Sequence, residues 1–453
     1  MGQMQVPAGA LYGAQTARAV ENFPISGWRM PREFIAAMGL IKQSAAEVNA
    51  TAGRLDKSIA GAIIKAAGEV ADNTLDDHFV LDVFQTGSAT SSNMNANEVI
   101  ANRAMQILGL SGQGQAHPND HVNMGQSSND VVPTAMHVSA ALAIRRRLTP
   151  ALAGLRDALL AKAKQFDAVV KIGRTHLMDA VPVRLGQEFG GYAAQVVDCM
   201  EMLDLAVDRL CILPLGGTAV GTGLNAPPRF ADQTCRLIAK KTGLSFRRTR
   251  NHFAAQSAKD AVVFASGVLK TTAIAMGKIA SDIRLMGSGP RCGLGELVLP
   301  ATQPGSSIMP GKVNPVICES VIQVACQVVG CDAAVTAGAT GGVGSILELN
   351  VAMPMMASNL LTAIRLLGNV AEVFERKCIA GLEVSAERCE QLVEQSLAMV
   401  TVLAPQIGYD VAAGIAKEAS LSGKTIRQIC LEKRLLPERD LKRLLDARSQ
   451  TGR

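Results

Sequence analysis

Residues 260–286, DAVVFASGVLKTTAIAMGKIASDIRLM, decide the fold class of this chain. After Asp260 the segment is apolar on nearly every face of a helix, and its only charged residues are Lys270, Lys278, Asp282 and Arg284. A helix that is hydrophobic all round is buried on most of its sides. The pattern therefore predicts a long helix in the centre of a bundle or between subunits.

Further long helical patterns flank this segment. From Val196 to Leu210, apolar residues recur at three- and four-residue steps, with acidic residues on the other side. The runs Val316–Val335 and Leu349–Val370 are apolar on most faces, and Pro354 is expected to start or kink the second run. We predict an all-α fold, with an elongated central bundle of long helices and smaller N- and C-terminal helical domains.

The pattern changes along the chain predict three consecutive domains. Residues 1–126 mix shorter helices with Gly- and Asn-rich loops, residues 127–382 hold the long helices, and residues 383–453 return to charged amphipathic helices. Long helices of this kind have sides that need partners. We therefore expect the central region to form the core of a homo-oligomer.

Composition excludes several classes of protein. The chain has 45 basic and 39 acidic residues, a net charge of +6 without a basic block, and 3% aromatic residues. No nucleic-acid partner is expected, because basic stripes and stacking platforms are missing. Gly and Pro break the longest uncharged stretches, so no membrane span is predicted. Ten cysteines without a CxxC pair, and no N-terminal leader pattern, indicate reduced thiols in a cytoplasmic protein.

Four polar islands interrupt the apolar background. Hydroxyls and amides in quantity suit a dicarboxylate, because each carboxylate accepts about four hydrogen bonds. The islands are TGSATSSNMNANE at 86–98, HPNDHVNMGQSSND at 117–130, GRTHLMDAVP at 173–182, and GSSIMPGKVNP at 305–315, which Glu319 extends.

The last island has the features of an anion site. Gly305 and Gly311 leave backbone N–H groups free to turn toward a ligand. Asn314 before Pro315 reads as an N-cap followed by Pro at the first helical position. A helix N-terminus beside Lys312 would attract a carboxylate or a phosphate.

Other interpretations of these motifs were weighed. Ser/Asn-rich segments between helices are usually caps and turns. His117 and His121 have a spacing seen in metal sites, but Pro118 prevents a regular helix from carrying both on one face, and neither a metal nor another cofactor is predicted. The glycines at 216–223 match neither GxGxxG nor a P-loop, and Ser306 lies in no GxSxG elbow.

Taken together and in order, the islands resemble segments of the class II fumarases of the fumarase/aspartase superfamily. LGGTAVGTGLN at 215–225, SGPRCGLGE at 288–296 and ELNV at 348–351 extend the resemblance over essentially the whole chain. Aspartate ammonia-lyases usually carry Gln at the position of His176, whereas fumarases carry THLxDA, as here. The resemblance implies a fumarate hydratase of the tricarboxylic acid cycle. Aspartate ammonia-lyase, or a non-catalytic scaffold such as the lens crystallins of the superfamily, are the alternatives.

The resemblance also implies a mechanism for interconverting fumarate and L-malate. From malate, a proton leaves the carbon beside a carboxylate, and the carbanion is stabilised as an aci-carboxylate. Ser306 would be the base, and His176, paired with Glu319, would act at the oxygen. The implied substrate-binding residues are Ser88, Thr90, Ser127, Ser128, Asn129, Thr175, Ser307, Lys312 and Asn314.

Two further implications concern assembly and a second site. Each active site of the family is shared by three subunits of a homotetramer, so the same is expected here. His117, Pro118, Asn119 and Asp120 match a second dicarboxylate site of some members. The chain also departs from the family pattern. Ala89 replaces a Gly and would strain its loop if that Gly has a positive φ, and Met124 and Ala254 are further departures.

Overall fold

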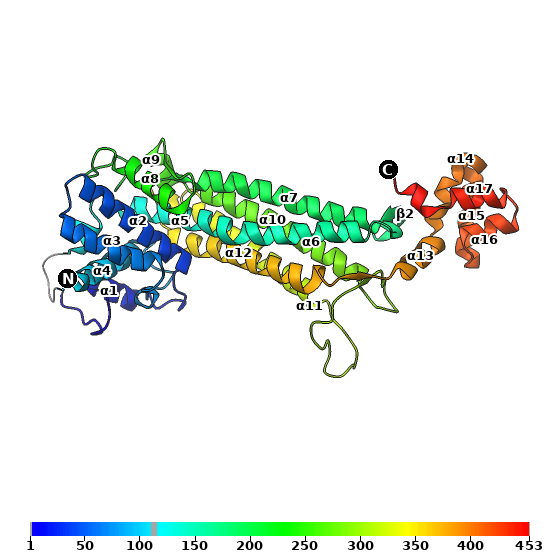
Figure 1. The fold of residues 1–453 in the computed structure, drawn as a ribbon, viewed down its shortest axis with the longest axis horizontal. Helices are drawn as coiled ribbons and strands as arrows, with labels where there is room; N and C mark the ends of the chain where they lie inside the picture. Colours follow the sequence, from blue (N-terminus) through cyan, green and yellow to red (C-terminus); the bar gives the residue numbers. More distant parts are fainter. Residues whose placement is uncertain (1, 110–115, 453) are drawn as a thin grey trace. The chain divides into compact units, whose positions relative to one another are not determined.

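The computed structural model describes residues 2–109 and 116–452, and most of them are helical (Figure 1). The predicted all-α fold built on long helices is confirmed. The helix α10 spans Asp260–Met286, as predicted from its continuous apolar pattern. α11 spans Val316–Ala339 and α12 spans Met353–Phe374, and Pro354 is the second residue of α12, where it starts the helix without breaking it.

The chain packs into two compact units, each made of three separate stretches. Unit 1 comprises 1–150, 199–273 and 324–369, and unit 2 comprises 151–198, 274–323 and 370–453. The predicted domain limits at residues 126 and 382 stay a prediction. All the unit boundaries fall inside long helices, namely α6 (Thr149–Gln165), α7 (Leu185–Leu210), α10, α11 and α12.

In unit 1, α2 is the central packing element. Its apolar face buries Phe34, Ile41 and Val48, and it contacts α3, α5 and α8, while α4 packs on α1 and α3. Asp56 caps α3 by accepting from two backbone N–H groups. The helices of this layer are α1 (Ala14–Asn22), α2 (Arg32–Thr51), α3 (Lys57–Ala71), α4 (Thr90–Ile107), α5 (Ser128–Ala143), α8 (Phe230–Thr242) and α9 (His252–Ser257).

Glu98, the one charged residue of the first polar island, has a structural role in unit 1. It lies buried on α4 and accepts hydrogen bonds from the backbone N–H groups of Gly13, Gln15 and Thr16. These donors lie at the N-terminus of α1, where helix N–H groups lack partners within the helix. The side chain of α4 thus supplies the cap of α1.

Unit 2 contains the one long hairpin in the described part of the chain. β1 (Val170–Thr175) pairs antiparallel with β2 (Met178–Arg184), and Ile172 of β1 packs into a core formed mainly by the C-terminal helices. Those helices are α13 (Ala386–Gln395), α14 (Ala404–Ile407), α15 (Tyr409–Ser422), α16 (Ile426–Glu432) and α17 (Glu438–Leu444). The remaining strands are two residues long: β3 (Ile212–Leu213), β4 (Arg247–Arg248), β5 (Leu297–Val298), β6 (Ser345–Ile346), β7 (Leu349–Asn350) and β8 (Glu383–Val384).

Two helices of the described chain, α10 and α11, are long and apolar enough to cross a membrane by length and composition alone. Of the most apolar 18-residue window of each helix, 50% in α10 and 33% in α11 is buried inside the chain. Buried core helices of soluble proteins pass the same test of length and composition. Both helices also carry exposed apolar side chains, among them Ile274 on α10 and Val329 on α11. Exposed apolar side chains of this kind can mark an interface with another protein chain.

Candidate functional site

In unit 1 the first two polar islands meet. The hydroxyl of Thr90 lies 2.8 Å from that of Ser88 and 2.9 Å from that of Ser128, so three hydroxyls from positions 88 to 128 form one hydrogen-bonded chain. Ser88 and Ser128 are largely buried within the chain, whereas Thr90 is exposed. A set of neutral donors held in this way suits a carboxylate oxygen.

Ser127 and Asn129 extend this cluster. Ser127 is the N-cap of α5 and forms a capping box with Asp130. The side-chain amide of Asn129 donates to the carbonyl of Ala219 at 2.8 Å, which ties the cluster to the glycine-rich segment 216–223. The capping interpretation of the Ser/Asn island is therefore correct for Ser127, and it coexists with the predicted clustering of hydroxyls.

Asp130 anchors the glycine-rich segment, a role that the sequence analysis missed. Its carboxylate accepts from the backbone N–H groups of Ser127, Gly216 and Thr218, each at 2.9 Å. Burial raises the pKa of Asp130, and these donors together with Lys42 oppose the rise. The Ser-x-x-Asp spacing at 127–130 is the capping-box signal that could have identified it.

Lys42 is the buried counter-charge in this region. It is fully buried on α2, donates to Asn123 Oδ1 at 2.8 Å, and interacts electrostatically with Asp130. Burial lowers its pKa to about 7, and Asp130 works against that shift. A lysine among the apolar residues of 34–48 is the sequence signal for such a group.

Ala89 precedes α4 with φ 54° and ψ 30°, which is the left-handed region. The strain expected at this departure from the family pattern is therefore present, because a side chain with a Cβ is disfavoured there. Nearby Gly87 has no room for a Cβ atom, which would lie 1.9 Å from the carbonyl oxygen of Val351. This close approach joins the first island to the ELNV segment.

The residues of the expected second dicarboxylate site form a compact, exposed turn. His117 Nδ1 accepts from the backbone N–H groups of Asn119 and Asp120, and the Asp120 carboxylate lies 3.1 Å from the same nitrogen. Pro118 starts the short π-helical turn η2 (Pro118–Val122). His121 Nδ1 accepts from the backbone of His117.

In unit 2, Thr175 and His176 lie at the tip of the β1–β2 hairpin. Thr175 pairs with Met178, so His176 and Leu177 form a two-residue loop, with φ angles of 56° and 62°. Two left-handed residues in a two-residue loop make a type I′ turn, which normally takes Asn-Gly. Neither residue is glycine, so the turn is strained.

The loop at 305–315 is closed by its own hydrogen bonds. Gly305 N–H donates to the Lys312 carbonyl at 2.9 Å, and the Asn314 side-chain amide donates to the Gly305 carbonyl at 2.8 Å. The prediction that Asn314 caps α11 is wrong, because this amide closes the loop and the carbonyl of Pro315 accepts the first helical bond, from Glu319 N–H at 3.0 Å. A Cβ atom at Gly305 would lie 2.3 Å from the Lys312 carbonyl oxygen, so the closure requires glycine.

Ser306 lies inside this closed loop. Its Oγ accepts from the backbone N–H groups of Ile308 and Met309 at 3.2 and 3.1 Å. Lys312 and Ser307 are exposed on the same loop, and Glu319 is half-buried in the first turn of α11. His176 is exposed, and among the described residues no hydrogen bond or ion pair joins it to Glu319.

The predicted site residues are divided between the two units. Unit 1 holds Ser88, Thr90, Ser127, Ser128 and Asn129, and unit 2 holds Thr175, His176, Ser306, Ser307, Lys312, Asn314 and Glu319. No group of three or more His, Cys, Asp or Glu side chains in the described residues could hold a metal ion.

Comparisons with known proteins cover nearly the whole chain. The family described as Lyase matches residues 2–330, and the family described as Fumarase C C-terminus matches residues 399–451. The chain is 54% identical to the class II fumarate hydratase of Mycobacterium tuberculosis, over 98% of this chain and 94% of that protein. It is 52% identical to human mitochondrial fumarate hydratase, over 95% of this chain and 84% of that protein.

A solved structure gives the same result for the fold. The class II fumarase of Schistosoma mansoni matches with a TM-score of 0.96 at 39% sequence identity, over 99% of this chain and 97% of that one.

Proposed function

Because the chain belongs to the class II fumarate hydratases, we propose that it hydrates fumarate reversibly to L-malate with Ser306 as the base and His176 and Glu319 acting at the oxygen. The enzyme is a hydro-lyase. The observation that carries the assignment of the base is the hydrogen bonding of Ser306 inside the closed loop.

Ser306 is suited to bear negative charge. A serine hydroxyl is a weak base, and it acts as one only when its alkoxide is stabilised. The N–H groups of Ile308 and Met309 already donate to Oγ, and such bonds strengthen when the acceptor is ionised. The ammonium of Lys312 on the same loop adds positive charge. Ser306 would then take the proton from the carbon next to the carboxylate of malate.

Substrate carboxylates have two sets of donors. Lys312 and Asn314 would bind the carboxylate that takes up charge as the aci form, which is stabilisation directed to the transition state. The neutral donors of unit 1, with Thr175 and Ser307, would bind the remaining oxygens without adding charge. Those donors in unit 1 are Ser88, Thr90, Ser127, Ser128 and Asn129.

His176 would exchange a proton with the substrate hydroxyl through a water molecule, with Glu319 orienting its ring. Its position at the tip of a strained turn supports this role, since strain of this kind gathers at functional sites. We further propose that the turn at His117–Asp120 binds a second dicarboxylate, as the resemblance implies.

We propose that the enzyme is a homotetramer whose active sites each draw on three subunits. One observation supports this. α10 and α11 carry exposed apolar side chains, among them Ile274 and Val329, that a second copy would cover. We also propose a cytoplasmic location, since the sequence has no CxxC pair and eight of its ten cysteines are buried, as expected of thiols in a reducing compartment.

One assay tests the activity. Purified enzyme is incubated with fumarate, with and without ammonium, and loss of the double bond is followed in the ultraviolet. Loss without ammonium is the expected result. Loss only with ammonium would identify an aspartate ammonia-lyase, and no loss in either condition would identify a non-catalytic scaffold.

A further inference from the structure

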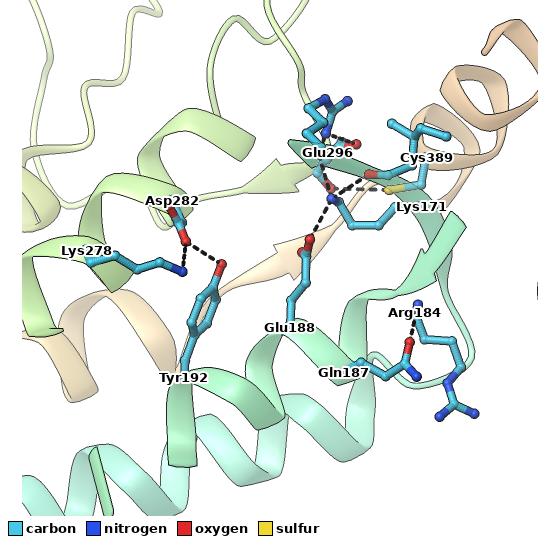
Figure 2. Close-up of polar contacts among 11 residues, drawn as sticks. Lys171, Arg184, Gln187, Glu188, Tyr192, Lys278, Asp282, Glu296 and Cys389 are labelled. Carbon is cyan, nitrogen blue, oxygen red and sulfur yellow. Dashed lines mark hydrogen bonds and ion pairs between the residues drawn. The ribbon is translucent and has the colours of Figure 1, made fainter. Parts of the chain in front are cut away.

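Along the hairpin from the strained turn that carries His176, four charged side chains form a partly buried group. Arg174 Nη1 donates to both carboxylate oxygens of Glu296, at 2.9 Å each. Lys171 Nζ lies 3.0 Å from Glu188 Oε1 and 3.6 Å from Glu296 Oε2 (Figure 2). Glu296 is fully buried and the Lys171 side chain is 2% exposed, whereas the side chains of Arg174 and Glu188 are 14% and 26% exposed. Two cations and two carboxylates therefore balance one another at the edge of the core.

The backbone of Glu296 is held on both sides. Its N–H donates to the carbonyl of Met286 at the end of α10, and its carbonyl accepts from the N–H of Ser385, both at 2.9 Å. Arg174 is therefore bound to a fixed point and not to a mobile side chain. A buried carboxylate with this much support also needs its cation, because a lone charge is costly to bury.

The hairpin itself is irregular where Arg174 leaves it. The register shifts between Ile172 and Arg174, with one extra residue on β2, and a bulge of this kind increases the local twist and changes the direction of side chains. Lys171 and Arg174 are three residues apart and would point to opposite faces of a flat strand, yet both reach Glu296. A Cβ atom at Gly173 would lie 2.6 Å from the carbonyl oxygen of Val181, so the strands approach closely here.

We propose that the Arg174–Glu296 ion pair is a positioning device that holds the left-handed turn at His176 and Leu177 in the conformation needed for catalysis. The proposal rests on the role of His176 proposed above. Arg174 lies two residues before His176, and Leu177 is 75% exposed, so burial of its side chain does little to hold the turn. Without the pair, the strained turn would relax to other conformations, and the imidazole would lose its orientation.

The test compares Arg174→Met, Arg174→Lys, Glu296→Gln and the double variant R174M/E296Q with a matched control, Glu188→Gln. The control removes one charge from the same partly buried group without touching Arg174. In folded R174M we expect kcat to fall about 100-fold, the size of effect that a misplacement of about 1 Å can cause, with KM changed by less than about threefold. R174K should recover part of the loss, because it keeps the positive charge.

Two readouts separate positioning from general destabilisation. If the pair acts as one unit, R174M/E296Q should lose little more kcat than R174M alone, because effects within a coupled pair are not additive. Hydrogen–deuterium exchange of the peptide covering 170–184 should be faster in R174M and E296Q than in the wild type and in E188Q. The double variant leaves no unpaired buried carboxylate at position 296, so it remains informative if R174M does not fold.

The exchange measurement also keeps this proposal apart from the proposed function. If His176→Asn kept wild-type turnover, the role of His176 would be lost, while the exchange data would still report on the anchor. A folded R174M or double variant with kcat within twofold of the wild type and unchanged exchange at 170–184 overturns the proposal.

Discussion

The two halves of the proposed site are built in opposite ways. The unit 1 half presents neutral groups, and its hydroxyls form hydrogen bonds with one another. Its charged residues Asp130 and Lys42 are buried. The unit 2 half carries the charged and reacting groups on an exposed loop and on a strained hairpin turn. Rigid neutral donors can be formed before substrate arrives, whereas groups that change charge need a surrounding that can close over them. We therefore expect substitutions in unit 1 to change chiefly KM, and substitutions in unit 2 to change chiefly kcat.

The largest expected effect is on the chemical half. Ser306→Ala should lower kcat by about 10³-fold, because it removes the base while the loop keeps its other hydrogen bonds. Steady-state kinetics of the folded variant measure this. Ser307→Ala, one residue along the same loop, should lose far less, and an S306A enzyme with wild-type turnover would exclude Ser306 as the base.

The buried charges of unit 1 should make stability depend on pH. Burial lowers the pKa of Lys42 and of Lys259 to about 7, below the usual 10.5. Between pH 7 and 10.5 the unfolded chain therefore binds more protons than the folded one, and the free energy of unfolding rises with pH. Each lysine adds at most about 1.4 kcal/mol per pH unit to that rise.

Urea unfolding between pH 7.5 and 9 measures this slope. Lys42→Met should remove about half of it, since Lys259 remains. Lys65→Met, an exposed lysine on α3, should leave it unchanged. A K42M slope equal to that of the wild type would show that Lys42 keeps its usual titration.

A smaller effect is expected in the binding half. Thr90→Val keeps the shape of Thr90 but removes the hydroxyl that joins Ser88 to Ser128. KM should rise about tenfold, which corresponds to one hydrogen bond to a charged group, with kcat changed much less. Thr90→Ser should restore KM. A drop in kcat alone would mean that Thr90 belongs to the chemical half.

The smallest effect concerns the backbone at Ala89. Ala89→Gly should stabilise the protein by about 0.5 kcal/mol, because relief of the left-handed strain slightly outweighs the entropy of an added glycine. The same change at Ala104, inside α4, should instead cost about 1 kcal/mol. Thermal unfolding of both variants measures the contrast, and destabilisation by both would show that Ala89 bears no strain.

Features that depend on neighbouring residues could be predicted from the sequence, whereas features that depend on distant contacts could not. The ends of α10 and the start of α12 were predictable, because an all-round apolar pattern and Pro354 act within their own segments. The prediction that Asn314 caps α11 was wrong, because its side-chain amide donates to the carbonyl of Gly305, nine residues earlier. The turn at His176 gave no hairpin signal, since type I′ turns usually contain Asn and Gly.

Assignments that need distant partners were out of reach in the same way. Nothing around position 296 in the sequence indicates that its carboxylate meets Arg174, 122 residues earlier. The contact between Thr90 and Ser128 was expected only through the family resemblance, which implies that both residues bind the same substrate.

The interleaving of the two units has a consequence for synthesis on the ribosome. Unit 1 needs residues up to 369 of the 453, while the first stretch of unit 2, 151–198, emerges long before its partners. At about 5–20 residues per second, the ribosome needs roughly 10 to 40 seconds to pass from residue 151 to residue 369. During that time neither unit can finish folding, because each lacks its last stretch. The need of this chain for chaperones should therefore depend on how fast the ribosome translates residues 151 to 369.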